Sequence, residues 1–154
     1  MPTIEIIAID CPAVPNFPRF KGLAYIAEDK LVSHRGLFRT ELNKHTGVIV
    51  HLAGKDFTEK NGFWFAGNLM HWDLGHTLQF LREPARDVRR LLALMLKASP
   101  SGRGIFLSDY QFGPSRKKME RRMVTQDRFW AMHDAGKLRY NALYQIRDDR
   151  RTRS

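Results

Sequence analysis

The stretch Thr3-Ile4-Glu5-Ile6-Ile7-Ala8-Ile9-Asp10 decides the fold class of this 154-residue chain. It is rich in isoleucine, contains few polar residues and stops at Cys11-Pro12. A nearly continuous apolar run of this kind favours a central strand that is covered on both faces over an edge strand. The chain length corresponds to one domain, so we expect a single domain over residues 1–154.

More strands are expected in the first half of the chain. After a loop that contains Pro12, Pro15 and Pro18, residues 22–27 and 31–42 read as strands on either side of a hairpin turn. We expect these strands to be antiparallel to residues 3–10. Short β candidates at 48–52 and 63–66 are expected to lie in a β/loop excursion over residues 43–76, outside the core sheet.

The second half contains the clearest helix and the clearest strand. Pro84 suits the first turn of a helix, and Val88, Leu91, Leu92 and Met95 follow the i, i+3, i+4, i+7 spacing of one apolar stripe. This helix is expected to end at the Ser99–Gly102 turn.

Two further elements follow a short buried strand at 104–108. Thr125 is a natural N-cap and Gly136 a natural C′ residue, so together they bracket a helix over 126–135. Residues 138–147 alternate between apolar and polar side chains and predict a strand. The order predicts an α/β fold, with α+β as the alternative: a mixed sheet of five or more strands, antiparallel at its N-terminal side, with helices packed on it.

The charge of the chain is unevenly distributed. Residues 1–77 hold 8 basic and 8 acidic residues, whereas the whole net charge of +10 lies in residues 78–154. Positive charge concentrated in this way attracts nucleic acid, RNA or DNA, although a solvated basic surface explains it as well. Residues 115–123 predict a short amphipathic helix with a cationic outer face, and residues 147–154 form a basic C-terminal tail. The cations of the predicted helix are Arg116, Lys117, Lys118, Arg121 and Arg122.

Three aspartates are candidates for metal ligands. Asp10 and Asp109 each close a predicted strand, and Asp87 lies in the first turn of the long helix. Groups at strand ends converge at one rim of an open α/β sheet, where Mg²⁺ or Mn²⁺ would neutralise their repulsion. Two such ions can activate water and stabilise the leaving oxygen of a phosphodiester. The alternative is that each aspartate caps a turn or a helix N-terminus.

At this point the arrangement resembles the ribonuclease H-like superfamily over residues 1–40 and 80–147. The stretch Phe106-Leu107-Ser108-Asp109-Tyr110-Gln111-Phe112 looks like its strand-end acid motif, and residues 16–25 look like its Pro/Gly-rich loop entering the second strand. The basic segment 115–123, followed by Asp127-Arg128-Phe129-Trp130, is similar to the cationic protrusion that grips substrate in some of these nucleases.

The resemblance implies a parallel fourth strand and metal-binding acids at Asp10, Asp87 and Asp109. Its fourth acid lies after the last strand, where only Asp148 or Asp149 is available. Trp130 is expected to support the basic helix. Two functions therefore remain open: a metal-dependent nuclease, or a non-catalytic basic subunit that binds nucleic acid or docks on a protein complex.

Other patterns compete with this one. His71-Trp72-Asp73-Leu74-Gly75-His76 could bring His71, Asp73 and His76 onto one metal, with His51, although packing and capping explain the segment as well. Asp10 with Glu28-Asp29-Lys30 also resembles the acid and E-x-K pattern of restriction-endonuclease-like nucleases, and a hairpin turn is its alternative. The single cysteine, the short apolar runs and the absence of a signal-peptide pattern favour a cytoplasmic protein with no membrane contact.

Overall fold

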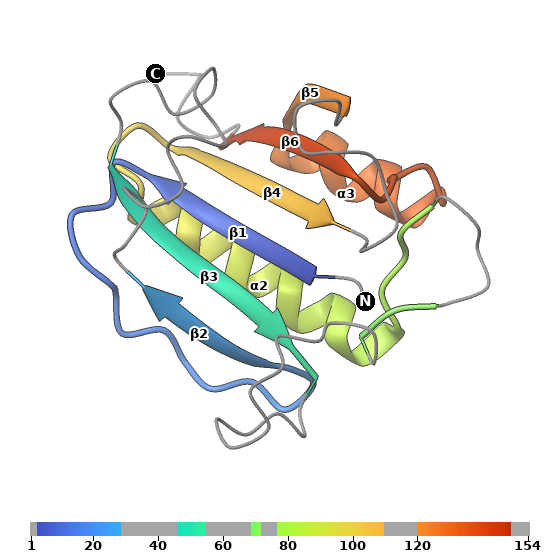
Figure 1. The fold of residues 1–154 in the computed structure, drawn as a ribbon, viewed down its shortest axis with the longest axis horizontal. Helices are drawn as coiled ribbons and strands as arrows, with labels where there is room; N and C mark the ends of the chain where they lie inside the picture. Colours follow the sequence, from blue (N-terminus) through green and yellow to red (C-terminus); the bar gives the residue numbers. More distant parts are fainter. Residues whose placement is uncertain (1–2, 29–45, 55–68, 72–76, 110–119, 149–154) are drawn as a thin grey trace.

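The computed structural model describes residues 3–28, 46–54, 69–71, 77–109 and 120–148. They form a six-stranded mixed sheet with two helices, α2 and α3, on one face (Figure 1). The strand order is β2-β3-β1-β4-β6-β5. The elements are β1 (Thr3–Ile9), β2 (Ala24–Glu28), β3 (Gly47–Ala53), α2 (Arg82–Ala98), β4 (Arg103–Asp109), β5 (Glu120–Thr125), α3 (Gln126–Asp134) and β6 (Ala142–Arg147).

The first strand lies inside the sheet, as its apolar run predicts. β1 pairs antiparallel with β3 on one side and with β4 on the other. Every residue of β1 after Thr3 is buried. An isoleucine-rich strand is stable in this place because both of its faces are removed from water.

The expected excursion over residues 43–76 is wrong for residues 47–53. These residues form β3, which pairs with both β1 and β2 and is therefore part of the core sheet. Local β propensity predicts that these residues form a strand. Which strands they pair with depends on burial of their apolar side chains in the folded protein, and a short sequence window does not contain that information. The strand expected at 31–42 and the β candidate at 63–66 lie outside the described residues.

β4 runs antiparallel to β1, whereas the ribonuclease H-like resemblance implies a parallel fourth strand. The reason is the direction of α2. The helix ends at Ala98, and the next residue, Ser99, donates from Oγ to the carbonyl of Ile9 at 2.6 Å, so α2 ends beside the end of β1. Only a tight turn separates the helix from Arg103. The chain must therefore enter β4 from this end and run back against β1.

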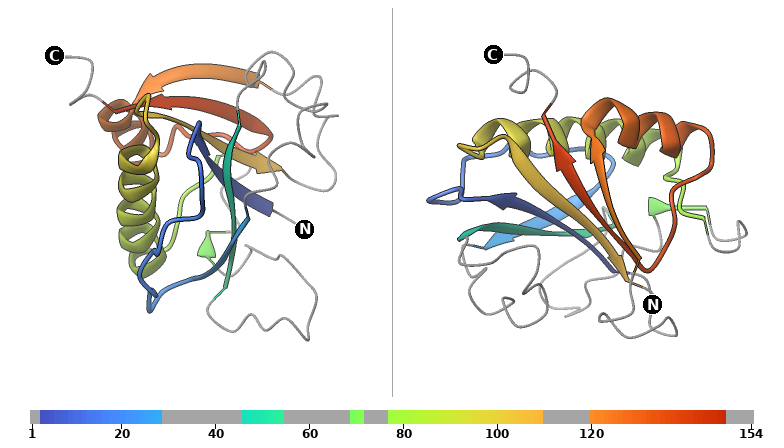
Figure 2. Two further views of the ribbon diagram at one scale, coloured as in Figure 1. Left: turned by 90° about the vertical axis from the view of Figure 1, so that its left-hand side faces the viewer. Right: turned by 90° about the horizontal axis from the view of Figure 1, so that it is seen from above.

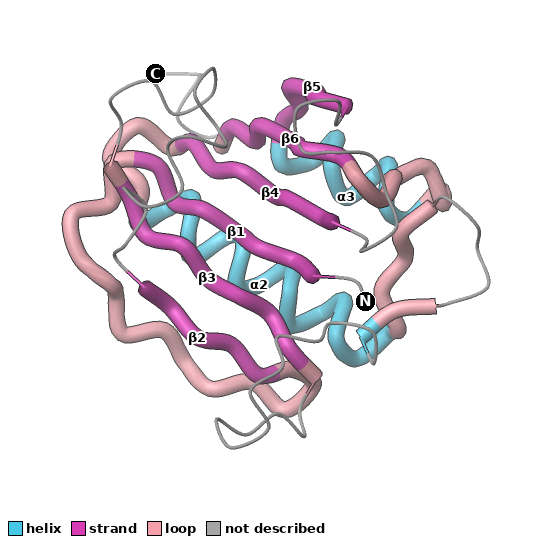
Figure 3. The backbone as a smooth tube through the Cα atoms, viewed as in Figure 1, coloured by secondary structure: helices cyan, strands magenta, loops and turns pink. Residues whose placement is uncertain are grey.

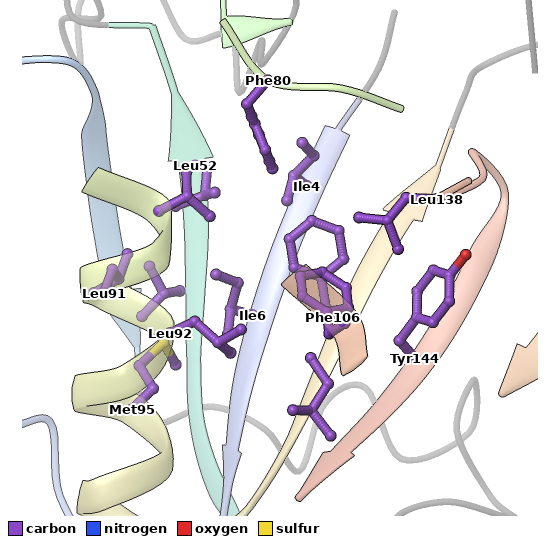
Figure 4. Close-up of a cluster of buried hydrophobic side chains, with 14 of the residues drawn as sticks. Ile4, Ile6, Leu52, Phe80, Leu91, Leu92, Met95, Phe106, Leu138 and Tyr144 are labelled. Atoms are coloured by element: carbon purple, nitrogen blue, oxygen red, sulfur yellow. The ribbon is translucent and has the colours of Figure 1, made fainter. Parts of the chain in front are cut away.

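Both helices cover the same face of the sheet (Figure 2). The predicted apolar stripe of α2 is confirmed, because its four residues are fully buried against even-numbered residues of β1 and β3. Beneath α3, Phe106 packs against Phe129 and Phe80 with ring centroids 4.9 and 6.2 Å apart (Figure 4). Burial of this apolar surface is the main stabilising contribution to the fold.

The opposite face of the sheet is apolar as well. Its cluster comes from alternate residues of the four inner strands, each at most 3% exposed: Ile7, Ile9, Ile49, Ile105, Leu107 and Leu143. Figure 3 shows these strands side by side, with both helices behind them. The sheet centre is therefore built from strands that are apolar on both faces.

The predicted start and the capping residues of α3 are confirmed, and the helix ends at Asp134, one residue before the expected end. Thr125 Oγ1 accepts a hydrogen bond from Arg128 N at 3.1 Å, and Gly136 has φ +69°, the left-handed conformation that ends many helices. β6 begins later than expected, at Ala142. It still presents its predicted apolar face, with Tyr144 and Ile146, to the helices.

The helix expected at 115–123 is wrong for residues 120–123. These residues belong to β5, which pairs in parallel with β6 from Glu120↔Ala142 to Thr125↔Arg147. Pairing with the exposed edge of β6 outweighs the weak helical pattern of this basic stretch. Arg116, Lys117 and Lys118 lie outside the described residues.

Candidate functional site

The three aspartates predicted to share a metal site are not brought together. Asp109 is paired with Thr3, at the start of β1, whereas Asp10 follows the end of β1. At about 3.3 Å per residue, the two lie roughly 23 Å apart along the strand direction. The expectation that strand ends converge assumes parallel strands, and β1 and β4 are antiparallel.

Asp87 is separated from Asp10. It lies twelve residues before Ser99, which marks the end of β1 near Asp10, and this interval spans roughly 18 Å of helix. Its Oδ2 accepts a hydrogen bond from Gly22 N at 2.7 Å, which ties the loop before β2 to α2. Asp87 therefore has a structural role in positioning this loop.

In the part of the chain that the structure describes, no three His, Cys, Asp or Glu residues lie close enough to hold a metal ion. Asp10, Asp87 and Asp109 are all within that part. Asp149, the candidate fourth acid, lies outside it. Its neighbour Asp148 donates its backbone N–H to the carbonyl of Gly102 at 2.9 Å.

The histidine cluster is divided between two places. His51 lies on β3, where its Nδ1 is 3.9 Å from Glu5 Oε1 and its Nε2 is 3.6 Å from Glu28 Oε2. The two carboxylates contact opposite sides of the imidazole ring, which does not suit a shared metal ion. His71 instead lines a pocket beside α2. Asp73 and His76 lie outside the described residues, as do Asp29 and Lys30 of the E-x-K pattern.

The described basic residues of the 115–123 segment lie on the last strand of the sheet. Arg121 and Arg122 are exposed on β5, and Arg122 Nε donates to Glu120 Oε1 at 2.7 Å. Trp130, expected to support a basic helix here, is 6% exposed and belongs to the core. Its ring lies against Phe129 and His133 and beneath Arg89 of α2.

A larger cationic surface lies on α2, which we call the α2 cationic face. Its residues are exposed, and at 100° per residue they fall within an arc of roughly 100° around the helix. Helical neighbours at these spacings project side by side. The five residues of this face are Arg82, Arg86, Arg89, Arg90 and Lys97.

One end of the α2 cationic face borders a pocket of about 480 Å³ between α2 and α3. Arg82, Arg86 and Arg89 line it from α2, and Trp130 and His133 line it from α3. A third wall comes from the chain before α2. There His71 N donates to the carbonyl of Gln79 at 3.0 Å, and Phe80 packs on His133. The pocket thus joins α2 and the chain just before it to α3, which lies about 40 residues further along the sequence.

A chain of hydrogen bonds fixes the α3 wall of this pocket. Phe80 N donates to His133 Nε2 at 3.0 Å, so the proton of a neutral His133 lies on Nδ1, 2.9 Å from Asp134 Oδ1. Asp134 Oδ2 in turn accepts from Arg89 Nη2 at 3.1 Å. The hydrogen bond to His133, together with the nearby Arg89 guanidinium, lowers the pKa of the Asp134 carboxyl. Because both nitrogens of His133 are engaged, the imidazole positions its neighbours and does not serve as a general base.

Arg89 is held on a second side by Trp130. Its guanidinium carbon lies 4.8 Å from the indole ring centroid, within the range of cation–π attraction. Arg90 lies 5.9 Å above the ring of Phe20 in the same way. These contacts hold two of the five cations in place on the helix surface.

The arginines of α2 are not among the binding residues that the sequence predicts. A usable signal was present, because Arg82, Arg86, Arg89 and Arg90 recur at i, i+4, i+7 and i+8 on the polar side of a helix whose apolar stripe was already recognised. The predicted binding residues are instead the five cations of residues 116–122.

Comparison of the chain with protein-family models, with curated proteins and with solved structures finds no match. None of the helices in the described residues is both long and apolar enough to cross a membrane.

Proposed function

We propose that this protein binds nucleic acid without cleaving it, and that the α2 cationic face is the contact surface. The observation that carries the proposal is the set of five exposed cations within one narrow arc of a single helix. The 17 residues of α2 span roughly 24 Å, and a nucleic-acid backbone presents a negative charge every few ångströms over such a length.

Between the two functions that the sequence left open, the geometry favours binding. Two-metal cleavage needs carboxylates around two ions about 4 Å apart, and Asp10 and Asp109 are at opposite ends of the sheet. The antiparallel β4 also removes the main topological support for a ribonuclease H-like nuclease. A cationic helix face needs neither feature.

The contact is expected to be mainly electrostatic and independent of sequence. Each phosphate neutralised by Lys or Arg releases a counterion, so affinity falls steeply with salt. Arg residues additionally form bidentate hydrogen bonds with phosphate oxygens. Contacts to phosphates of this kind do not distinguish bases.

The test is fluorescence anisotropy with labelled single-stranded and duplex oligonucleotides from 50 to 300 mM salt, about the range where such contacts weaken. Arg90→Gln/Lys97→Gln removes two charges from the α2 cationic face, outside the pocket. We expect the slope of log affinity against log salt to become shallower by about 1.4 for single strands and 1.8 for duplexes.

The matched control is Arg121→Gln/Arg122→Gln on β5, which removes the same charge from another exposed surface. It is expected to change the slope by less than half as much. Circular dichroism shows whether each variant retains its fold. The proposal is wrong if the wild-type protein does not bind either oligonucleotide, or if only the β5 variant changes the slope.

A further inference from the structure

The pocket at the end of the α2 cationic face has the dimensions of a ligand site. Its volume of about 480 Å³ falls within the usual range for sites that hold small molecules. Phe80, Ala85 and Trp130 give it apolar walls, and the arginines occupy one side. It is therefore large enough for a phosphate group together with part of the residue that carries it.

The charges of this pocket are not equally available to a ligand. Arg89 is engaged by the Asp134 carboxylate at 3.1 Å and by the Trp130 ring. Arg82 and Arg86 form no ion pair with any described residue, and both are exposed on the helix. The described lining holds three guanidinium groups against one carboxylate, which leaves two positive charges.

Arg82 and Arg86 are placed to act on one ligand. They are four residues apart on α2, a spacing that puts their Cβ atoms roughly 5–6 Å from each other. Two like charges at this spacing destabilise a helix, so a shared anion would relieve a repulsion that is present in the free protein. Two guanidinium forks side by side also match the several oxygens of a phosphate group.

The two excess positive charges of the pocket lining favour an anion that carries close to two negative charges. A phosphate monoester carries about −1.5 to −2 at pH 7, whereas a phosphate inside a nucleic-acid strand carries a single charge. A monoester also has only one covalent neighbour and can enter a pocket end-on, while an internal phosphate continues in two directions. Of the phosphates in a strand, only a terminal one meets both conditions.

We propose that this pocket binds the terminal phosphate monoester of a nucleic-acid strand, with Arg82 and Arg86 as its ligands. The proposal rests on the proposed function, because the rest of the strand would lie along the α2 cationic face. Arg89, Asp134 and His133 are positioning residues, since they fix the wall against which the phosphate is held. No covalent step is involved.

The experiment compares otherwise identical oligonucleotides that end in a phosphate or a hydroxyl group, at the 5′ end in one series and at the 3′ end in the other. Affinity is measured by anisotropy with the full chain at fixed salt. The wild-type protein is expected to bind one phosphorylated end about tenfold more tightly than the matching hydroxyl end, as one charge-assisted contact would give. A saturating nucleoside monophosphate should remove this difference.

Two variants with the same change in charge separate the pocket from the helix surface. Arg82→Gln/Arg86→Gln should bring the ratio of the two affinities to about one, whereas Arg90→Gln/Lys97→Gln should weaken both oligonucleotides and keep the ratio. Arg82→Lys/Arg86→Lys, which retains the charge but loses the forks, should give an intermediate ratio.

The outcomes distinguish the two proposals. Equal, salt-sensitive binding of phosphate and hydroxyl ends by the wild-type protein overturns the pocket proposal and leaves the proposed function standing. No binding of any oligonucleotide overturns both. A preference that survives Arg82→Gln/Arg86→Gln overturns the assignment of these residues.

Discussion

Gly104 lies where α2 crosses β4, and a side chain does not fit there. A Cβ atom on this residue would lie 3.0 Å from the carbonyl oxygen of Ile7 and 3.0 Å from Leu96 Cδ2. The first neighbour is backbone of the central strand, which cannot move without disturbing its pairing with β4. The close contact between helix and sheet therefore depends on this glycine.

We expect Gly104→Ala to lower the free energy of unfolding by about 1–3 kcal/mol, the usual cost of overpacking, measured by urea denaturation. Gly136 provides the comparison, because its constraint is of a different kind. A Cβ atom on Gly136 would meet open space, but the backbone φ of +69° strains any L side chain. Gly136→Asn should be tolerated better than Gly136→Ala, since asparagine adopts this conformation more readily. Wild-type stability in Gly104→Ala would contradict the close contact.

Residue-level signals in the sequence predict local structure well and the candidate site poorly. Thr125 and Gly136 act through bonds and backbone angles within a few residues, so their roles follow from the sequence alone. Whether Asp10 and Asp109 meet depends instead on the direction of β4 against β1, which no local pattern encodes.

At the scale of elements, α3 depends on its first turn. Thr125 Oγ1 satisfies the N–H of Arg128, one of the donors left without a partner at a helix start. Thr125→Ala is expected to cost about 1 kcal/mol in a thermal or urea unfolding experiment. Thr125→Ser retains the hydroxyl and should remain close to wild type. If both variants lose the same stability, the methyl group and not the cap is responsible.

The basic segments α2 and 115–123 show two ways in which a sequence-based prediction goes wrong: the helix α2 is predicted but its proposed role in binding is not, and residues 120–123 are predicted in the wrong secondary structure. The apolar stripe of α2 from Val88 to Met95 spans about two turns and identifies the helix, but it carries no information about the role of the exposed side. In residues 115–123 the helical pattern depends on Met119 and Met123 on one stripe and on the i, i+4 pair Arg116 and Glu120. Met123 is 62% exposed on β5, so it does not contribute to an apolar stripe.

At the scale of the whole molecule, the proposed function predicts independence from divalent metal. Asp10→Asn/Asp109→Asn, and addition of EDTA, should each change the affinity for oligonucleotides by less than about twofold, because the α2 cationic face contains no carboxylate ligand set. Labelled RNA and DNA should stay intact with Mg²⁺ on a denaturing gel. Cleavage that Asp109→Asn abolishes would restore the nuclease hypothesis.

The uneven charge of the chain was visible in the sequence, but the location of the cations in space was not. The excess in residues 78–154 predicts an attraction for polyanions, and α2 lies in that half. The pocket beside α2 also requires Phe80 from the chain before this helix, and Trp130 and His133 from α3. Their meeting is a property of the tertiary packing, which periodicity and composition do not encode.

The last strand of the sheet gives its arginines a role that does not involve a ligand. β5 pairs only with β6 among the described strands, and Arg121 and Arg122 project from it into solvent. Strands in this position are templates for edge-to-edge addition of another chain, and charged side chains oppose that addition. We therefore expect the arginines of β5 to oppose self-association into extended sheets.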